Sequence, residues 1–129
     1  MSRQTRSQGL AQTAYLQIAK HIEKQTGDGQ KKPAKEFIST VKKFPALIHT
    51  CGLAQAVAFT MAKKDQKEYV GYLAAVLQAS GHSEVTNAES LGERARRSDL
   101  NSYLRLSRDA IAAASWLKRY VEAAAGEEG

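Results

Sequence analysis

Two clusters of basic side chains are the residues whose type and spacing could do chemistry. The lysine cluster comprises Lys31, Lys32, Lys35, Lys42 and Lys43, and the arginine cluster comprises Arg94, Arg96 and Arg97. Helical spacing places several of the lysines on or near one face. The arginines precede a predicted helix N-terminus, where free N–H groups also attract anions. These eight residues predict a surface that binds nucleic-acid phosphates, and a merely solubilising surface is the alternative.

No catalytic or metal-binding pattern accompanies these clusters. A phosphate-cradling GxxxxGK[ST] loop does not occur in the sequence. A structural zinc site needs about four His or Cys ligands, and only His49 and Cys51 lie close together in the sequence. On a helix these two residues point to different faces, which argues against a thiolate–imidazole couple. We therefore expect a protein that is not an enzyme and needs no cofactor or metal.

The charge of the chain is positive and unevenly distributed. Lysine and arginine number 19 against 13 acids, which gives a formal net charge of +6. Twelve of these bases but only four of the acids lie within residues 1–67. Such an asymmetry concentrates positive potential in one region and favours a polyanionic partner.

Cysteine usage and the absence of targeting signals predict where the protein resides. The single cysteine, Cys51, excludes an intrachain disulfide, and the opening MSRQTRSQ has no apolar region of a signal peptide. The least charged stretch, residues 44–62, is interrupted by Pro45 and Gly52 and is a poor membrane span. We expect a cytoplasmic protein without membrane contact.

The hydrophobic pattern predicts an all-α fold: one domain, residues 1–129, built as a bundle of five to six helices. Apolar residues recur at helical spacing in five segments, about residues 5–25, 34–44, 53–64, 66–79 and 98–124. The last segment is a long C-terminal helix with Ser98 or Asp99 as N-cap, and its apolar stripe includes Leu100 and Leu104. Residues 53–64 are apolar nearly all round, which predicts a helix buried at the centre of the core.

Glycine, proline and polar residues mark the breaks between these helices. Pro45 either kinks the helix before it or begins a short new one, and Gly52 ends that turn. Residues of about 26–33 and 81–97 are expected to be mobile basic loops, the second with at most a short helix near residues 88–91, and residues 126–129 are expected to be a short acidic tail. Trp116 lies across from the apolar stripe of the last helix, so it is either buried by a second neighbour or offered to a partner.

Two segments of the sequence resemble a known family. The run KKFPALIHTCGLAQAVAF, residues 42–59, has a proline followed by apolar residues, then Gly-Leu and an alanine-rich helix that ends in phenylalanine. Near the end, Tyr103-Leu104 precedes the alanine-rich residues 110–114 and the block SWLKRY at residues 115–120. In order and separation these segments resemble the small subunit of Cmr complexes, the type III-B CRISPR RNA-guided effectors. The resemblance spans essentially the whole chain.

The resemblance implies a non-catalytic, all-helical small subunit that stacks in several copies along an antiviral ribonucleoprotein. The implied partners are the other Cmr effector subunits, guide RNA, target RNA and further copies of the chain, with basic surface toward the RNA. Architectural roles are implied for Pro45, Gly52, Leu53, Phe59, Trp116 and Leu117. The resemblance assigns no role to Cys51 and does not say which lysines touch RNA, so those assignments rest on charge.

Two alternatives remain open. One is the small subunit of a sister CRISPR effector. The other is a stand-alone helical RNA-binding or interaction module that uses Trp116 as its anchor. The proteins that co-purify with the chain would separate these alternatives from a Cmr subunit.

Overall fold

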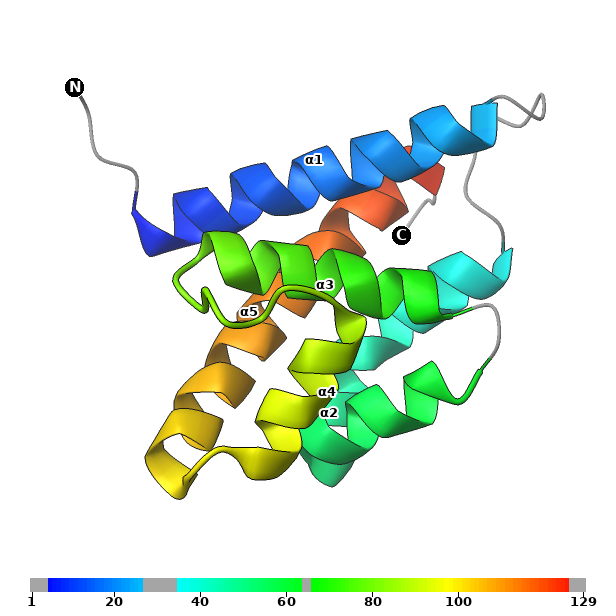
Figure 1. Cartoon of the computed structure of the whole chain (residues 1–129). Helices are drawn as coiled ribbons and strands as arrows, with labels where there is room; N and C mark the ends of the chain where they lie inside the picture. Colours follow the sequence, from blue (N-terminus) through cyan, green and yellow to red (C-terminus); the bar gives the residue numbers. More distant parts are fainter. Residues whose placement is uncertain (1–4, 27–34, 64–65, 126–129) are drawn as a thin grey trace.

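Five helices make up the part of the chain that the structure, a computed structural model, describes, namely residues 5–26, 35–63 and 66–125 (Figure 1). They are α1 (Arg6–Thr26), α2 (Lys35–Met61), α3 (Lys67–Ala79), α4 (Ala88–Arg97) and α5 (Leu100–Ala125). No strand occurs in these residues, so the predicted all-α bundle with a long last helix is confirmed. Apart from Thr26, the expected loop at 26–33 lies outside the described residues, as does the expected tail at 126–129.

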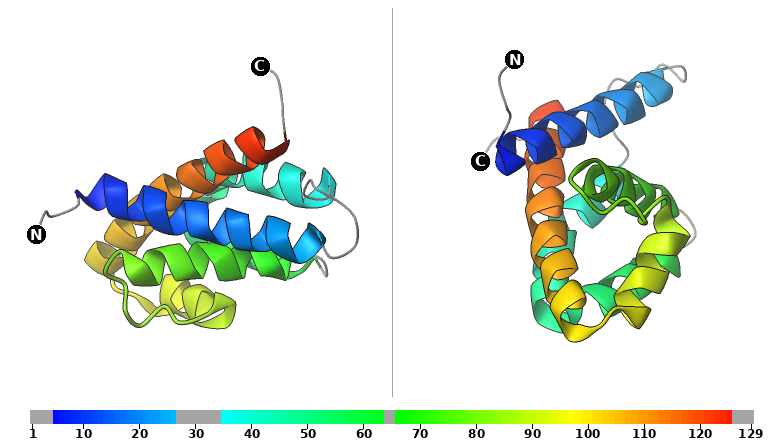
Figure 2. Two further views of the ribbon diagram at one scale, coloured as in Figure 1. Left: turned by 90° about the horizontal axis from the view of Figure 1, so that it is seen from above. Right: turned by 60° about the vertical axis from the view of Figure 1, so that its left-hand side comes forward.

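The long last helix is the element around which the others are arranged. α1 and α3 run side by side, and α5 crosses behind them (Figures 1 and 2). α5 contacts each of the other four helices, while α2 also contacts α3 and α4. In the view of Figure 1, α2 and α4 close the lower side of the bundle.

α2 consists of two helical halves that are joined at Gly52. This residue has φ 84° and ψ 160°, a backbone conformation that only glycine adopts readily. The predicted end of a helix at Gly52 is therefore confirmed. Pro45 lies within the first half, and Gly52 is the residue of α2 with non-helical backbone angles, so no new helix begins at Pro45.

One core joins the buried faces of all five helices. Its largest fully buried side chains include Phe44, Leu53, Tyr69, Leu73 and Leu117. Burying one large apolar side chain stabilises a fold by roughly 1.5–3 kcal/mol. The apolar stripes that predict the helices are therefore also what holds them together.

Two predictions about this core are wrong. The second half of α2 is not buried all round, because only one side of it faces the bundle, and Phe59 is 55% exposed. In α5, Leu100 is 70% and Leu104 56% exposed, since no described helix covers that side of the first turns. In this part of α5, Leu106 is buried in the core and Tyr103 packs against it.

Trp116 is half-buried beside a second aromatic ring of the same helix. It stacks on Tyr120 with ring centroids 5.8 Å apart and an interplanar angle of 22°. Tyr15 of α1 meets Tyr120 edge-on at 5.5 Å, and the guanidinium carbon of Arg119 lies 5.7 Å from the Trp116 ring. Trp116 is therefore only partly covered by its neighbour Tyr120, and its contact with a partner stays a prediction.

By length and composition alone, α2 is also apolar enough to cross a membrane. The core helix of a helical bundle has the same composition. α2 contacts α5 and α3 and is interrupted at Gly52. We therefore assign its hydrophobicity to the core of the bundle.

Candidate nucleic-acid interface

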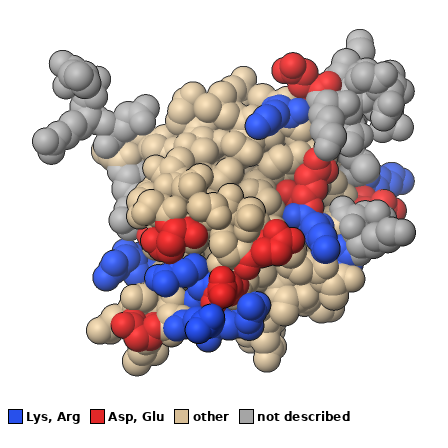
Figure 3. Space-filling model, in the orientation of Figure 1, with Lys and Arg blue, Asp and Glu red and all other residues tan. Residues whose placement is uncertain are grey.

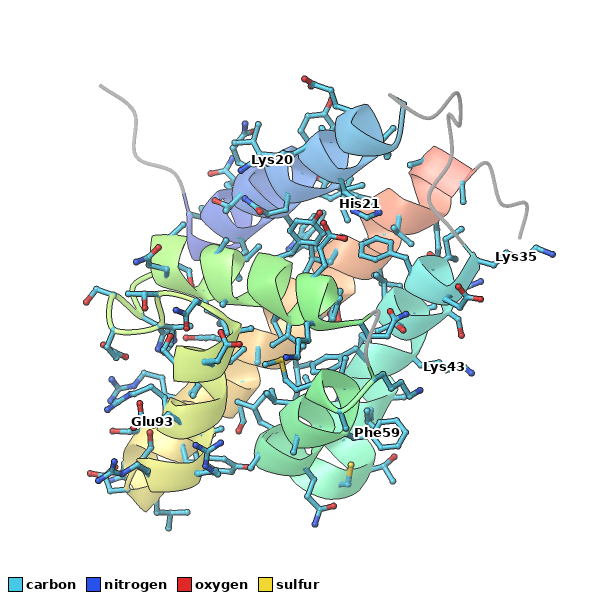
Figure 4. All side chains as sticks on the ribbon, turned by 45° about the vertical axis from the view of Figure 1, so that its right-hand side comes forward. Lys20, His21, Lys35, Lys43, Phe59 and Glu93 are labelled. Atoms are coloured by element: carbon cyan, nitrogen blue, oxygen red, sulfur yellow. The ribbon has the colours of Figure 1, made fainter. Side chains whose placement is uncertain are left out.

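Three members of the lysine cluster lie on the first half of α2. Lys35 and Lys43 are exposed, whereas Lys42 is half-buried. The buried stripe of the same helix faces the core, which turns the two exposed lysines outward. In Figure 4 both project from the same side of the molecule. The other two members, Lys31 and Lys32, lie outside the described residues.

The arginine cluster lies on a helix. At most a short helix near residues 88–91 was predicted within the loop at 81–97, but α4 continues to Arg97, so the predicted loop is wrong there. α4 begins with a capping box. The Oδ1 atom of Asn87 accepts a hydrogen bond from the Ser90 N–H at 2.8 Å, and the Ser90 hydroxyl oxygen accepts one from the Asn87 N–H at 2.9 Å. These bonds satisfy N–H groups that a helix start leaves without partners.

Small residues on the buried face of α4 explain why its sequence was predicted to be a loop. This face is formed by Ala88, Leu91, Gly92 and Ala95. Three of the four are alanine or glycine, which contribute little to a hydrophobic pattern. A Cβ atom on Gly92 would lie 3.6 Å from Cγ1 of Val57, so the small residues let α4 approach α2 closely.

Two of the three arginines pair with carboxylates. The Nη1 atom of Arg97 lies 3.2 Å from Oε2 of Glu93, and Nε of Arg94 lies 3.7 Å from Oε1 of Glu84. Arg96 is exposed. Arginines in the last turn of a helix also interact favourably with its dipole. Ion pairs and the helix dipole therefore give the arginines a structural role, and their contact with RNA stays a prediction.

The helix N-terminus that the arginines were expected to share with an anion is occupied by Asp99. Its Oδ1 atom accepts a hydrogen bond from the Ser102 N–H at 2.9 Å, which confirms Asp99 as one of the two predicted N-caps. Hydrogen bonds from the Ser102 backbone and side chain, and then the charges of Arg94 and Arg105, hold the pKa of Asp99 below its usual value. This carboxylate already fills the role that a phosphate would have at the start of α5.

The described members of the two clusters do not form one patch. Glu93, which shares α4 with the arginines, lies on the opposite side of the molecule from Lys35 and Lys43 in Figure 4. In Figure 3 the basic side chains on the lower part of the visible face are interspersed with acidic ones.

A groove between the two halves of α2 is a candidate site that the sequence analysis missed. It has a volume of about 280 Å³ and is lined by Ser39, Thr40, Lys43, Phe44, Ala46, Leu47, Thr50, Phe59, Thr60 and Lys63. The ammonium nitrogen of Lys63 lies 4.5 Å from the centroid of the exposed Phe59 ring. Phe59 and Lys63 are four residues apart, and this spacing could have indicated an aromatic ring beside a positive charge. The sequence analysis instead predicted that Phe59 is part of the core.

A second hollow, of about 260 Å³, lies beside a hydrogen bond between His82 and the buried Asp109. His82, Arg94 and Arg105 line it, and Nε2 of His82 lies 2.7 Å from Oδ2 of the buried Asp109. Arg108 approaches the other oxygen of this carboxylate, with Nε 3.6 Å from Oδ1. These contacts join the segment after α3 to α5. Among the described residues, no group of three or more His, Cys, Asp or Glu side chains could hold a metal ion.

Two tyrosines, the buried Tyr69 and the half-buried Tyr72, lie where α1, α2 and α3 meet. The Tyr72 hydroxyl is 2.8 Å from Nδ1 of His21, whose ring stacks on Phe37 at 3.9 Å. Burial, and then the hydrogen bond and charge of Glu68, raise the pKa of Tyr72, while burial alone raises the pKa of Tyr69. Both side chains are therefore neutral packing groups at neutral pH.

Comparisons with known proteins agree on one family. The family model for CRISPR-associated protein (Cas_Cmr5) matches residues 6–124. A relative from Thermus thermophilus called CRISPR system Cmr subunit Cmr5 is 37% identical over 121 residues, which cover 92% of this chain and 95% of the relative. The crystal structure of a CRISPR-associated Cmr5 family protein from the same organism matches with a TM-score of 0.75 at 33% identity, covering 94% of this chain and 97% of that one.

Proposed function

We propose a function from the premise that this chain belongs to the Cmr5 family of CRISPR-associated proteins. It serves as the non-catalytic small subunit of a Cmr complex, a type III-B CRISPR effector. The observation that carries this proposal is the similarity along nearly the full length of both chains to a protein called a Cmr subunit. The same five-helix bundle would then be one part of a larger assembly.

The proposal has a finer part that concerns RNA. Several copies of the chain stack along the complex in the cytoplasm and turn the lysine cluster toward guide RNA and target RNA in antiviral defence. The exposed Lys35 and Lys43 on one side of α2 and the net charge of +6 support this orientation. Because Arg94 and Arg97 pair with acids, we rank the lysines above the arginines as RNA contacts.

Membership of the complex is tested by co-purification. The full chain is tagged and expressed from its own genome, and the proteins and RNA that accompany it are identified. We expect other Cmr subunits and a guide RNA. Recovery of the chain alone, or with the subunits of a different CRISPR effector, would contradict the proposal.

The RNA surface is tested by charge reversal in the assembled complex. We expect Lys35→Glu with Lys43→Glu to weaken target-RNA binding and to reduce the dependence of log Kd on log salt by about 0.7 for each lost phosphate contact. The control is Lys20→Glu with Lys118→Glu, which changes the net charge by the same amount but places the new acids on α1 and α5. Equal weakening by both pairs would show that only net charge matters, and the lysine cluster would then not be the RNA surface.

A further inference from the structure

We infer that the groove between the two halves of α2 binds an unpaired RNA base, which stacks on Phe59 while Lys43 and Lys63 contact the adjoining phosphates. This inference rests on the proposed function and deepens it, because it names the site and the kind of contact. Neither Phe59 nor Lys63 belongs to the two basic clusters that the sequence singled out.

The turn at Gly52 creates this groove. Residues 39–50 of the first half of α2 form one wall, and residues 59–63 form the other. In Figure 4 Phe59 and Lys43 lie on the same side of the molecule, one below the other. The groove is therefore continuous with the side of α2 that presents the lysines.

Phe59 has the exposure of a contact residue. Its side chain is 55% exposed. Base stacking on an exposed aromatic ring is a general mode of single-stranded RNA recognition and tolerates any sequence. The ring thus offers the sequence-independent contact that a subunit of a guided effector requires.

The positive charge of the groove favours a nucleotide over a peptide as its ligand. Among the described residues that line it, the charged ones are Lys43 and Lys63, and none is acidic. The Lys63 ammonium lies 4.5 Å from the Phe59 ring centroid, so aromatic surface and positive charge are adjacent. An apolar peptide would gain nothing from the lysines, and an acidic peptide would gain little from the ring. A nucleotide uses both.

Size also favours one base over a larger occupant. A volume of about 280 Å³ lies just below the usual range of small-molecule pockets, so it suits a planar ring better than a docked helix. The hydroxyl groups of Ser39, Thr40 and Thr50 line the same groove. They can donate or accept hydrogen bonds at the edge of a base or at a ribose.

The experiment measures binding of a fluorescent single-stranded oligouridylate to the full chain and to the assembled complex. We expect Phe59→Ala to lower affinity about tenfold, the effect of losing one stacked base, without changing the salt dependence. Phe59→Trp should retain wild-type affinity. Lys43→Gln with Lys63→Gln should lower both the affinity and the salt dependence. Leu104→Ala removes an equally exposed apolar side chain from α5 and should change nothing.

The outcomes separate this inference from the proposed function. Wild-type RNA binding that Phe59→Ala leaves unchanged would overturn the inference alone. The same result with weaker retention of another Cmr subunit would identify the groove as a protein contact and overturn it too. A loss in Phe59→Ala that Phe59→Trp does not restore would exclude stacking. Absence of RNA binding by the wild type would overturn the RNA part of the proposed function together with this inference.

Discussion

The hydroxyl oxygen of Tyr103 accepts a hydrogen bond from the backbone N–H of Ala54, at 3.2 Å. The second half of α2 begins just after Gly52, and the first N–H groups of a new helical segment have no carbonyl partners within it. Tyr103 of α5 satisfies one of them. A Cβ atom on Gly52 would lie 3.2 Å from the same oxygen. Gly52 and Tyr103 together fix the angle between the two halves, and with it the groove that contains Phe59.

Gly52→Ala is expected to destabilise the fold by about 1–3 kcal/mol, because the backbone conformation at Gly52 is strained for any residue with a Cβ. Urea unfolding followed by circular dichroism measures this loss. Gly71→Ala is the matched control. Gly71 lies inside α3, where a Cβ would meet no atom within 4 Å, so alanine should stabilise the helix by roughly 0.5–1 kcal/mol. A gain in stability from both variants would contradict a strained turn at Gly52.

The helices that could be predicted from the sequence are those whose buried faces carry large side chains. Periodic leucines, valines and aromatic residues identify α1, α3 and α5, and Gly52 marks its own break because glycine ends helices. α4 was missed because its buried face is mostly alanine and glycine, and its capping box uses serine in place of the usual glutamate or glutamine. Phe59 was misplaced because hydrophobic periodicity cannot show which side of an apolar helix lacks a neighbour.

The candidate site was only partly predictable for a similar reason. Helical spacing placed Lys35 and Lys43 on the outside of α2, as observed. The groove depends on the turn at Gly52, which brings Phe59 and Lys63 opposite residues far earlier in the sequence. The pairing of Arg94 with Glu84 depends likewise on how the segment before α4 folds back. Such contacts follow from tertiary geometry, which a local pattern does not contain.

Tyr69→Phe is expected to leave stability at pH 7 unchanged or to raise it by up to about 1 kcal/mol. The Tyr69 hydroxyl is fully buried and has no hydrogen-bond partner among the described residues, so its desolvation is not compensated there. Tyr103→Phe is the control and should cost about 0.5–1.5 kcal/mol, because Tyr103 makes a hydrogen bond. Chemical denaturation of both variants makes the comparison, and a large loss from Tyr69→Phe would contradict it.

The same phenol predicts how stability changes in alkali. Burial raises the pKa of Tyr69 in the folded state, so the unfolded state ionises first. The stability that this difference contributes is present below the unfolded pKa of about 10 and is lost as the pH rises above it. We expect the wild type to lose more stability than Tyr69→Phe between about pH 8 and pH 11. Parallel losses would show that Tyr69 does not titrate on unfolding.

Asp99→Asn tests the cap of α5 and its charge. The pKa of Asp99 is lowered in the folded state, so the carboxylate stabilises the fold above its unfolded pKa of about 3.9 and ceases to do so as the pH falls through the folded value. Asparagine keeps a capping oxygen but not the charge. We therefore expect the variant to be less stable than the wild type at pH 7, with the difference shrinking near pH 3. The urea unfolding midpoints of both proteins at the two pH values measure this difference in stability. The same difference at pH 7 and pH 3 would exclude a role for the charge of Asp99.

Asp109→Ala is expected to destabilise the fold by about 1–3 kcal/mol, because it leaves the His82 ring without its hydrogen-bond partner. Asp109→Asn keeps an oxygen that can accept a hydrogen bond and should cost less. His82→Ala combined with Asp109→Ala should cost less than the sum of the single variants, since residues in contact are not additive. Arg108→Ala is the control, because the Arg108 side chain is 69% exposed and such pairs contribute little. Strict additivity of His82→Ala and Asp109→Ala would show that the 2.7 Å contact between His82 and Asp109 does not hold the segment after α3 to α5.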